Sequence, residues 1–231
     1  MIKIAHLYYD LLNLYGEQGN ILALKNTFLN QNIEVQIDYL TINDEIKFKD
    51  YDLIYIGSGS DENLFIVLND IKKYQKDLKK YINSDKYLIA TGNSYLLFGQ
   101  SIDEQDTLNI FDYYAKTNSE RLRCHSFCEY DNLSPIIGFQ NRKYVVQNNN
   151  NHLFKVIDGY GDNLKSEYEG IHYHNFIGTY LIGPLLIRNP HFTDLIIADL
   201  CIKNKYKYHE DTNTYEYRAY HEYLKNFYPK K

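Results

Sequence analysis

The sequence predicts an α/β fold, in which a mostly parallel sheet has helices on both faces and continues into a β-rich second half. Up to about residue 100, short apolar runs rich in β-forming residues alternate with segments of helical periodicity. Strands that alternate with helices in this way are typical of parallel sheets. After that point the β-like pieces are shorter. No linker or internal repeat interrupts the chain, so we expect a single domain over residues 1–231.

The elements of the first half can be placed in order. A helix is expected at 21–30 with Asn20 as its cap, because the apolar positions of that segment fall on one face. Residues 64–83 are expected to form one or two helices, and 95–98 a short helical turn. The expected strands, each a short apolar run, are 2–8, 34–40, 52–56 and 87–91.

The second half is expected to be richer in strands than in helices. A helix is predicted from about 192 to 204, and another near the C-terminus. The β-like pieces are 144–146, 153–157 and 178–182.

Composition and charge exclude several classes of protein. The formal net charge is −5, so no general affinity for nucleic acid is expected. No apolar run approaches the roughly 18 residues of a membrane span, and the N-terminus has no signal-peptide pattern. The three cysteines, Cys124, Cys128 and Cys201, do not make a disulfide framework. We therefore expect a cytoplasmic protein.

Two polar loops follow expected strands, at the carboxyl ends where parallel sheets build their sites. One loop is Gly92-Asn93-Ser94. The other contains Gly57, Ser58, Gly59, Ser60 and Asp61. Two interpretations of this second loop stay open. Its backbone N–H groups would bind an anion or oxyanion, or it is a tight turn that opens a helix capped by Ser60 or Asp61.

Several segments, in chain order, resemble the class I glutamine amidotransferases, in particular the cobyric acid synthase-like branch and the GatD-type subunits of lipid II isoglutaminyl synthase. Each match is short, but together they span most of the chain. The matching segments are Leu12–Leu24, Ile56–Asp61, Asn118–Leu122 with two extra residues, Gly138–Asn141, Glu169-Gly170 and Gly178–Pro184.

This resemblance implies a flavodoxin-like fold and a reaction on glutamine. In active members a cysteine on a sharp strand-to-helix turn attacks the side-chain amide, and a histidine acts as base and acid. The ammonia passes to a Mur-ligase-like (MurT-type) synthetase subunit. No cofactor is expected. Asn93, Arg121 and Asn141 are ligand-binding candidates beside the loop at 57–61, and the ligand would be glutamine or another small amide. Arg121 matches a family arginine and has a surface ion pair as its alternative role.

The chain departs from the family pattern at both catalytic places. The family turn reads Cys-Gly-Gly-Tyr-Gln, whereas here the stretch is Gly92-Asn-Ser-Tyr-Leu96, and Tyr95 fixes the register. The family histidine segment Gly-Thr-Tyr-Leu-His-Gly-Pro has Ile182 at the histidine place. Glycine offers no nucleophile and isoleucine no base. We therefore expect a degenerate member, which binds or regulates a Mur-ligase-like synthetase in cell-wall amidation without hydrolysing glutamine.

Two active alternatives stay open. The first is a serine hydrolase of the same fold that uses Ser94, for which His172 or His174 would have to supply the base; the alternative role of Ser94 is to cap the turn at 95–98. The second is a glutaminase that is still active. No metal site is expected, because neither the two histidines nor Cys124 and Cys128 have enough further ligands in the sequence.

Overall fold

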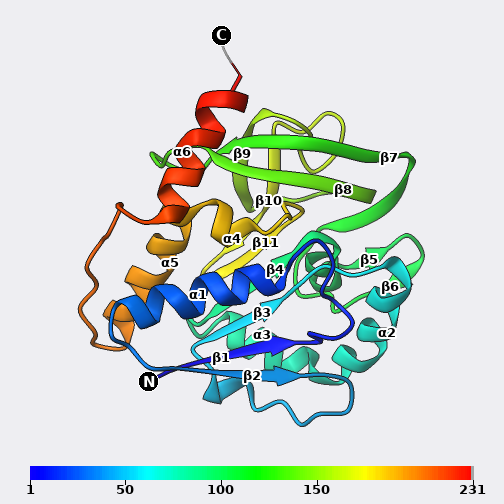
Figure 1. Ribbon diagram of the computed structural model, residues 1–231. Coiled ribbons are helices and arrows are strands. Elements are labelled where there is room, and N and C mark those ends of the chain that lie inside the picture. Colours follow the sequence, from blue (N-terminus) through cyan, green and yellow to red (C-terminus); the bar gives the residue numbers. More distant parts are fainter. Residues whose placement is uncertain (230–231) are drawn as a thin grey trace.

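The computed structural model describes residues 1–229. One sheet runs through both halves of the chain in the order β2-β1-β3-β4-β11-β10-β9-β7-β5-β6, and β8 pairs with β7 (Figure 1). This continuous sheet is compatible with one domain over 1–231, which stays a prediction. The strands are β1 (Ile2–Leu7), β2 (Val35–Leu40), β3 (Leu53–Ile56), β4 (Tyr87–Thr91), β5 (Ser101–Ile102), β6 (Gln105–Asp106), β7 (Tyr114–Glu129), β8 (Ile136–Gln147), β9 (His152–Asp158), β10 (Tyr168–Tyr173) and β11 (Phe176–Thr179).

The first half forms most of the parallel part of the sheet, as the sequence predicts, and β11 from the second half completes it. β2, β1, β3, β4 and β11 are all parallel to their neighbours within this part, whereas β10, β9, β7 and β8 continue the sheet in antiparallel pairings. The sixteen-residue strand β7 was not predicted. Its polar run from Lys116 to Arg123 is mostly exposed and lacks the apolar pattern by which strands are recognised.

Helices cover both faces of the parallel part. Alternate residues of β3 enter different cores: Ile54 and Ile56 pack with the helices α2 and α3, and Leu53 and Tyr55 pack with α1 and α5. The helices are α1 (Gln18–Asn30), α2 (Asp61–Ile71), α3 (Gln75–Ile82), α4 (Leu185–Arg188), α5 (Pro190–Lys203) and α6 (Tyr215–Phe227), and the 3₁₀ helices are η1 (Phe48–Asp50), η2 (Lys72–Tyr74) and η3 (Gly92–Phe98). No helix within residues 1–229 has the length and apolar character needed to cross a bilayer.

Three local predictions need correction. Asn20 lies inside α1 and does not cap it, because its side chain bonds Glu17 and Tyr55 and accepts the N–H of Leu186 at 2.6 Å. The turn at 95–98 is the end of a longer 3₁₀ helix that begins at Gly92. The strand expected at 178–182 ends at Thr179, and Ile182 forms only an isolated antiparallel bridge with Phe139.

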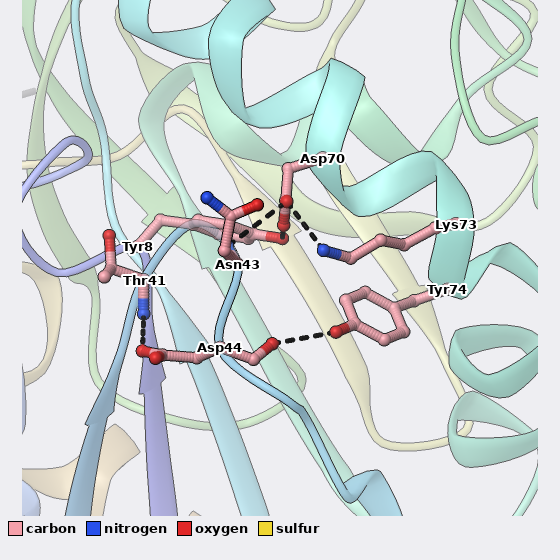
Figure 2. A network of polar contacts seen from close by, with 7 residues as sticks. All are labelled: Tyr8, Thr41, Asn43, Asp44, Asp70, Lys73 and Tyr74. Carbon is pink, nitrogen blue, oxygen red and sulfur yellow. Dashed lines mark hydrogen bonds and ion pairs between the residues drawn. The ribbon is translucent and has the colours of Figure 1, made fainter.

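One polar network fixes the connection after β2 against α2 (Figure 2). The Asp70 carboxylate accepts hydrogen bonds from the Tyr8 hydroxyl at 2.9 Å, the Lys73 ammonium at 2.7 Å and the backbone N–H of Asn43 at 3.4 Å. These donors hold the pKa of Asp70 below its ordinary value, although partial burial opposes them. The network anchors the base of the loop at the carboxyl end of β1, where Tyr8 has a φ of 55°.

Candidate functional site

The turn after β4 has the geometry of a nucleophile elbow. Gly92 follows Thr91, the last residue of the strand, and has a φ of 63° before the chain enters η3. This left-handed conformation is readily adopted by glycine and costs free energy for residues with a Cβ. The backbone turn that a family nucleophile would occupy is therefore present at Gly92.

Ser58 fills the space where a nucleophile would project from this turn. A Cβ atom built on Gly92 would lie 2.3 Å from Ser58 Oγ and 2.4 Å from Ser58 Cβ. The same Cβ would lie 3.2 Å from Cγ2 of Ile182. The two positions that the sequence analysis assigned to the family cysteine and histidine, Gly92 and Ile182, are thus neighbours in space. The surrounding side chains leave no room for a thiol on residue 92 unless Ser58 moves.

The side chain of Asn93 hydrogen-bonds both backbone groups of Gly59, which lies across the cleft. Its Nδ2 donates to the carbonyl oxygen of Gly59 at 2.9 Å, and its Oδ1 accepts from the Gly59 N–H at 3.1 Å. The Ser58 hydroxyl also donates to this Oδ1, at 3.3 Å. An oxyanion hole requires free N–H donors, and the Gly59 N–H already has a partner here.

The glycines of the loop at 57–61 allow close packing against the loop after β1. A Cβ on Gly57 would lie 2.4 Å from the carbonyl oxygen of Leu12, and one on Gly59 would lie 2.8 Å from that of Leu11. Gly57 is buried and does not line the cleft. Its position is explained by packing, whereas Gly59 both packs and borders the cleft.

Ser60 caps α2, as one of the two interpretations of this loop predicts. Its hydroxyl accepts the N–H of Asn63 at 3.1 Å. Asp61 begins the helix, where its charge is favourable to the helix dipole, and it also lines the cleft. The predicted cap is confirmed.

Arg121 closes one side of the cleft through Asn141 and Tyr15. The Arg121 Nε donates to the Asn141 side-chain oxygen at 2.6 Å, and Asn141 Nδ2 donates to the Tyr15 hydroxyl at 2.9 Å. Arg121 lies in an irregularity of β7 between Thr117 and Leu122, which contains the two residues that are extra relative to the family segment. The ion pair considered for Arg121 is wrong, since its observed partner is an amide.

The cleft between these groups is very small. Its volume is about 20 Å³, which is room for about one water molecule. A wider hollow of about 370 Å³ adjoins it. The cleft is lined by Tyr15, Ser58, Gly59, Asp61, Gly92, Asn93, Arg121, Asn141, Arg142, Lys143, Tyr144, Tyr180 and Ile182.

Ser94 does not line this cleft. It is fully buried, and its hydroxyl lies 2.9 Å from the carbonyl oxygen of Thr91 and 3.1 Å from that of Ile56, to which it donates. It does not act as the helix cap that we considered, because a cap accepts from a backbone N–H.

A buried carboxyl lies directly behind the elbow. Glu17 is fully buried and accepts from the Thr91 hydroxyl at 2.7 Å, from Asn20 Nδ2 at 3.0 Å and from the Tyr55 hydroxyl. Burial raises the pKa of Glu17 to about 7, against the opposing effect of these donors. The sequence alone does not indicate a role for Glu17, because one acidic residue in a Gly-containing turn carries no distinguishing pattern.

A second buried polar cluster lies on the other side of the cleft. Glu169 accepts from the Thr179 hydroxyl at 2.7 Å and from the Tyr180 N–H at 2.5 Å, and burial raises its pKa to about 7. Asp162 is likewise buried, and burial raises its pKa to about 6. The Arg142 guanidinium lies 4.3 Å from the centre of the Tyr180 ring. These groups hold the walls of the cleft in place from behind.

No metal centre was found within residues 1–229, where no three His, Cys, Asp or Glu side chains gather closely enough to hold an ion. His172 ends up on β10, but His174 follows the strand in a turn with a φ of 49°. Cys128 is buried in the core, and Cys124 lies 3.4 Å from the Ser126 hydroxyl.

Comparisons with known proteins show the family to which the chain belongs. The family described as the CobB/CobQ-like glutamine amidotransferase domain matches residues 3–190. A relative from Staphylococcus aureus, the GatD subunit of lipid II isoglutaminyl synthase (glutamine-hydrolyzing), is 32% identical over 205 residues, which cover 87% of this chain and 84% of the relative. The subunit of the same name from Streptococcus pneumoniae is 28% identical over 214 residues, covering 89% and 82%.

Solved structures show the same fold at low identity. A glutamine amidotransferase from Thermotoga maritima is 13% identical, with a TM-score of 0.53 over 89% of this chain and 86% of its own. The glutaminase domain of Trypanosoma brucei CTPS is 10% identical, with a TM-score of 0.51 over 94% and 99%. The α/β amidotransferase fold predicted from the sequence is thereby confirmed.

Proposed function

The chain belongs to the CobB/CobQ-like glutamine amidotransferase domain family, and we propose that it is a member without glutaminase activity, which serves as the non-catalytic partner of a Mur-ligase-like synthetase in lipid II amidation. The observation that carries this proposal is the elbow at Gly92, which keeps the family turn while Ser58 and Ile182 fill the space around it.

The missing groups are chemically necessary for the family reaction. A glycine at the elbow has no atom to attack an amide, and isoleucine cannot exchange a proton. When members of a catalytic unit act together, loss of one removes most of the activity. Either Gly92 or Ile182 alone would therefore support the proposal. The closeness of the two residues supports the sequence alignment that places them at the nucleophile and histidine positions.

The remaining chemistry of the site is also reduced. The Gly59 N–H is bonded to Asn93 and is not free for an oxyanion. The cleft at Gly92 has a volume of about 20 Å³, room for about one water molecule, and Gly92 does not line the wider hollow beside it. Glutamine is therefore expected to meet a closed surface at Gly92.

The role as a partner subunit comes from the relatives. Both are named as subunits of a glutamine-hydrolyzing lipid II isoglutaminyl synthase, and this chain matches more than four fifths of each. A subunit that keeps the fold but lacks the reactive groups retains the surfaces with which such a subunit contacts its synthetase. The cytoplasmic location expected from the sequence is part of this proposal.

The test is an assay of glutamate release from glutamine. The purified chain is measured alone and with a co-expressed Mur-ligase-like synthetase, beside the Streptococcus pneumoniae subunit with its own synthetase as the positive control. We expect no turnover above the blank for this chain and co-purification with the synthetase. Turnover that is lost on Ser94→Ala, together with labelling of Ser94 by a serine-directed phosphonate, would contradict the proposal and favour the serine hydrolase.

A further inference from the structure

One stretch of this acidic protein carries a marked net positive charge. Residues 72–86 contain six lysines and two aspartates, a net charge of +4, within a chain whose formal net charge is −5. The rest of the chain therefore carries −9, from −5 minus +4. This asymmetry gives the molecule one basic end.

The helical segment formed by η2 and α3 carries five of these lysines. Lys86 follows the segment, and its ammonium donates to the backbone carbonyl oxygens of Lys49 and Tyr51 at 2.7 Å. Leu78, Tyr81 and Ile82 are buried on the inner side of the segment. Four of its lysines stand at positions i, i+4, i+7 and i+8, which lie on one face of a helix. They are Lys72, Lys76, Lys79 and Lys80.

Most of the lysines in this region are not neutralised by the protein. Lys73 is paired with Asp70 at 2.7 Å (Figure 2), and Lys47 lies 3.8 Å from Glu45. Within residues 1–229, six others have no carboxylate within 4.0 Å. These six, which we call the lysine face, are Lys49, Lys72, Lys76, Lys79, Lys80 and Lys86.

A shallow groove of about 500 Å³ adjoins the lysine face, and three of the six lysines, Lys49, Lys80 and Lys86, line it. Lysine side chains border it, Phe48 and Tyr81 lie beneath it, and Asp77 is the one acidic side chain in its lining. Lys86 directly precedes β4, whereas Gly92 follows that strand. The lysine face and the cleft are thus at opposite ends of β4, and α3 lies at the lower end of the molecule in Figure 1.

We propose that the lysine face docks the protein on an anionic membrane surface. The charges are distributed along a helical stretch of about 16 Å and do not converge on one point, which suits a surface of many headgroups better than a single bound anion. The stretch contains no arginine, whose fork would select a defined carboxylate or phosphate partner. Since the apolar side of α3 is buried in the core, binding is electrostatic and does not insert the helix.

The choice of a lipid surface over an acidic protein segment rests on the proposed function. The relatives are subunits of an enzyme named for a lipid substrate. A synthetase complex that acts on a lipid gains from a subunit that holds it at the membrane, and docking at the end of β4 remote from Gly92 leaves the cleft side free.

The experiment is co-sedimentation of the full chain with vesicles. One set contains phosphatidylcholine with about 30 mol % phosphatidylglycerol, and the other contains phosphatidylcholine alone. The variant Lys76→Gln/Lys79→Gln/Lys80→Gln removes three charges from the lysine face. The matched variant Lys165→Gln/Lys205→Gln/Lys207→Gln removes three exposed charges elsewhere that likewise have no ion-pair partner within residues 1–229. Circular dichroism melts confirm that both variants are folded.

We expect binding only to the anionic vesicles, with loss at high salt because exposed charges are screened. The lysine-face variant should partition roughly 100-fold less, since each lysine near an anionic surface contributes roughly fivefold, and the matched variant should bind like the wild type. Absence of binding at low salt, or equal loss in both variants, overturns the proposal. So does binding of a fluorescent Glu-rich peptide to the lysine face when vesicles fail to bind. None of these outcomes affects the glutamate-release assay, so the two proposals can fail separately.

Discussion

Gly92→Ala is expected to destabilise the protein by much more than its single added methyl group suggests. The substitution places a Cβ on a backbone with a φ of 63°, at 2.3 Å from Ser58 Oγ. Two costs therefore combine. One is the left-handed conformation itself, and the other is the overlap with Ser58, which must shift or distort its loop.

The two costs can be separated with a second glycine. The left-handed conformation costs a residue with a Cβ about 1–2 kcal/mol, and overpacking costs about 1–3 kcal/mol, so Gly92→Ala should lose about 2–5 kcal/mol. Gly16 has a φ of 84°, but a Cβ there would meet nothing closer than Pro184 Cδ at 3.7 Å. Gly16→Ala should therefore carry only the backbone cost, about 1–2 kcal/mol.

Removing the Ser58 side chain should relieve the overlap. Ser58→Gly alone costs about 0.5–1 kcal/mol in backbone entropy. Combined with Gly92→Ala it should recover about 1–3 kcal/mol, so the two changes couple with a favourable sign. Urea unfolding of the four proteins of this cycle, with Gly16→Ala as control, measures the coupling. If Gly92→Ala costs no more than Gly16→Ala, or if the two changes are additive, Ser58 does not fill the nucleophile place.

Three further changes test the buried and bridging groups by urea unfolding. Burial raises the pKa of Glu17 from 4.5 to about 7. The contribution of the neutral carboxyl to the free energy of unfolding is therefore complete below pH 4.5 and is lost as the pH rises through 7. Glu17→Gln should remove this loss of roughly 3 kcal/mol, and an unchanged pH profile would contradict the prediction. Burial lowers the pKa of His6 from 6.5 to about 4, so wild-type stability falls as the pH drops from 6.5 to 4, and His6→Phe should become more stable relative to wild type across that range. Asp70→Asn should cost about 1–3 kcal/mol because three donors lose a carboxylate, whereas the exposed control Asp77→Asn should stay within about 0.5 kcal/mol; equal effects would show that the network adds nothing.

The parallel half of the fold could be predicted because β1, β3, β4 and β11 are buried on both faces. Such strands appear as continuous apolar runs, for example Leu53–Ile56, and their order with the helices allows few topologies. The antiparallel half was harder. β7 is half exposed and polar, and its strand character comes from pairing with β8 and β9, distant in the chain. Asn20 was misassigned because tertiary partners, not the helix end, satisfy its amide.

The sequence predicted which residues gather at the candidate site, but not that their side chains nearly fill the cleft between them. Most of the residues chosen from the two loops and the family segments do line one cleft. The filling of that cleft by Ser58 and Asn93 depends on side-chain directions across separate loops, which no local pattern reports. The buried Glu17 and Glu169 were missed as functional-site neighbours for the same reason, since their pKa values follow from burial that only the folded chain creates.

The packing around Gly92 bears on the proposal that the protein has lost the family's catalytic groups. A simple loss of cysteine and histidine would leave a hollow at the elbow, and a hollow costs stability. Here the side chains of Ser58 and Ile182 occupy that space. The Asn93 amide satisfies the backbone N–H and carbonyl of Gly59 and accepts from the Ser58 hydroxyl. Groups from three different loops thus fit one another at the cleft. That arrangement is expected of a subunit whose shape is still used while its chemistry is not. The coupling between Ser58→Gly and Gly92→Ala measures this mutual fit directly, and independent effects at the two positions would remove the reason to regard the closed cleft as an adapted feature.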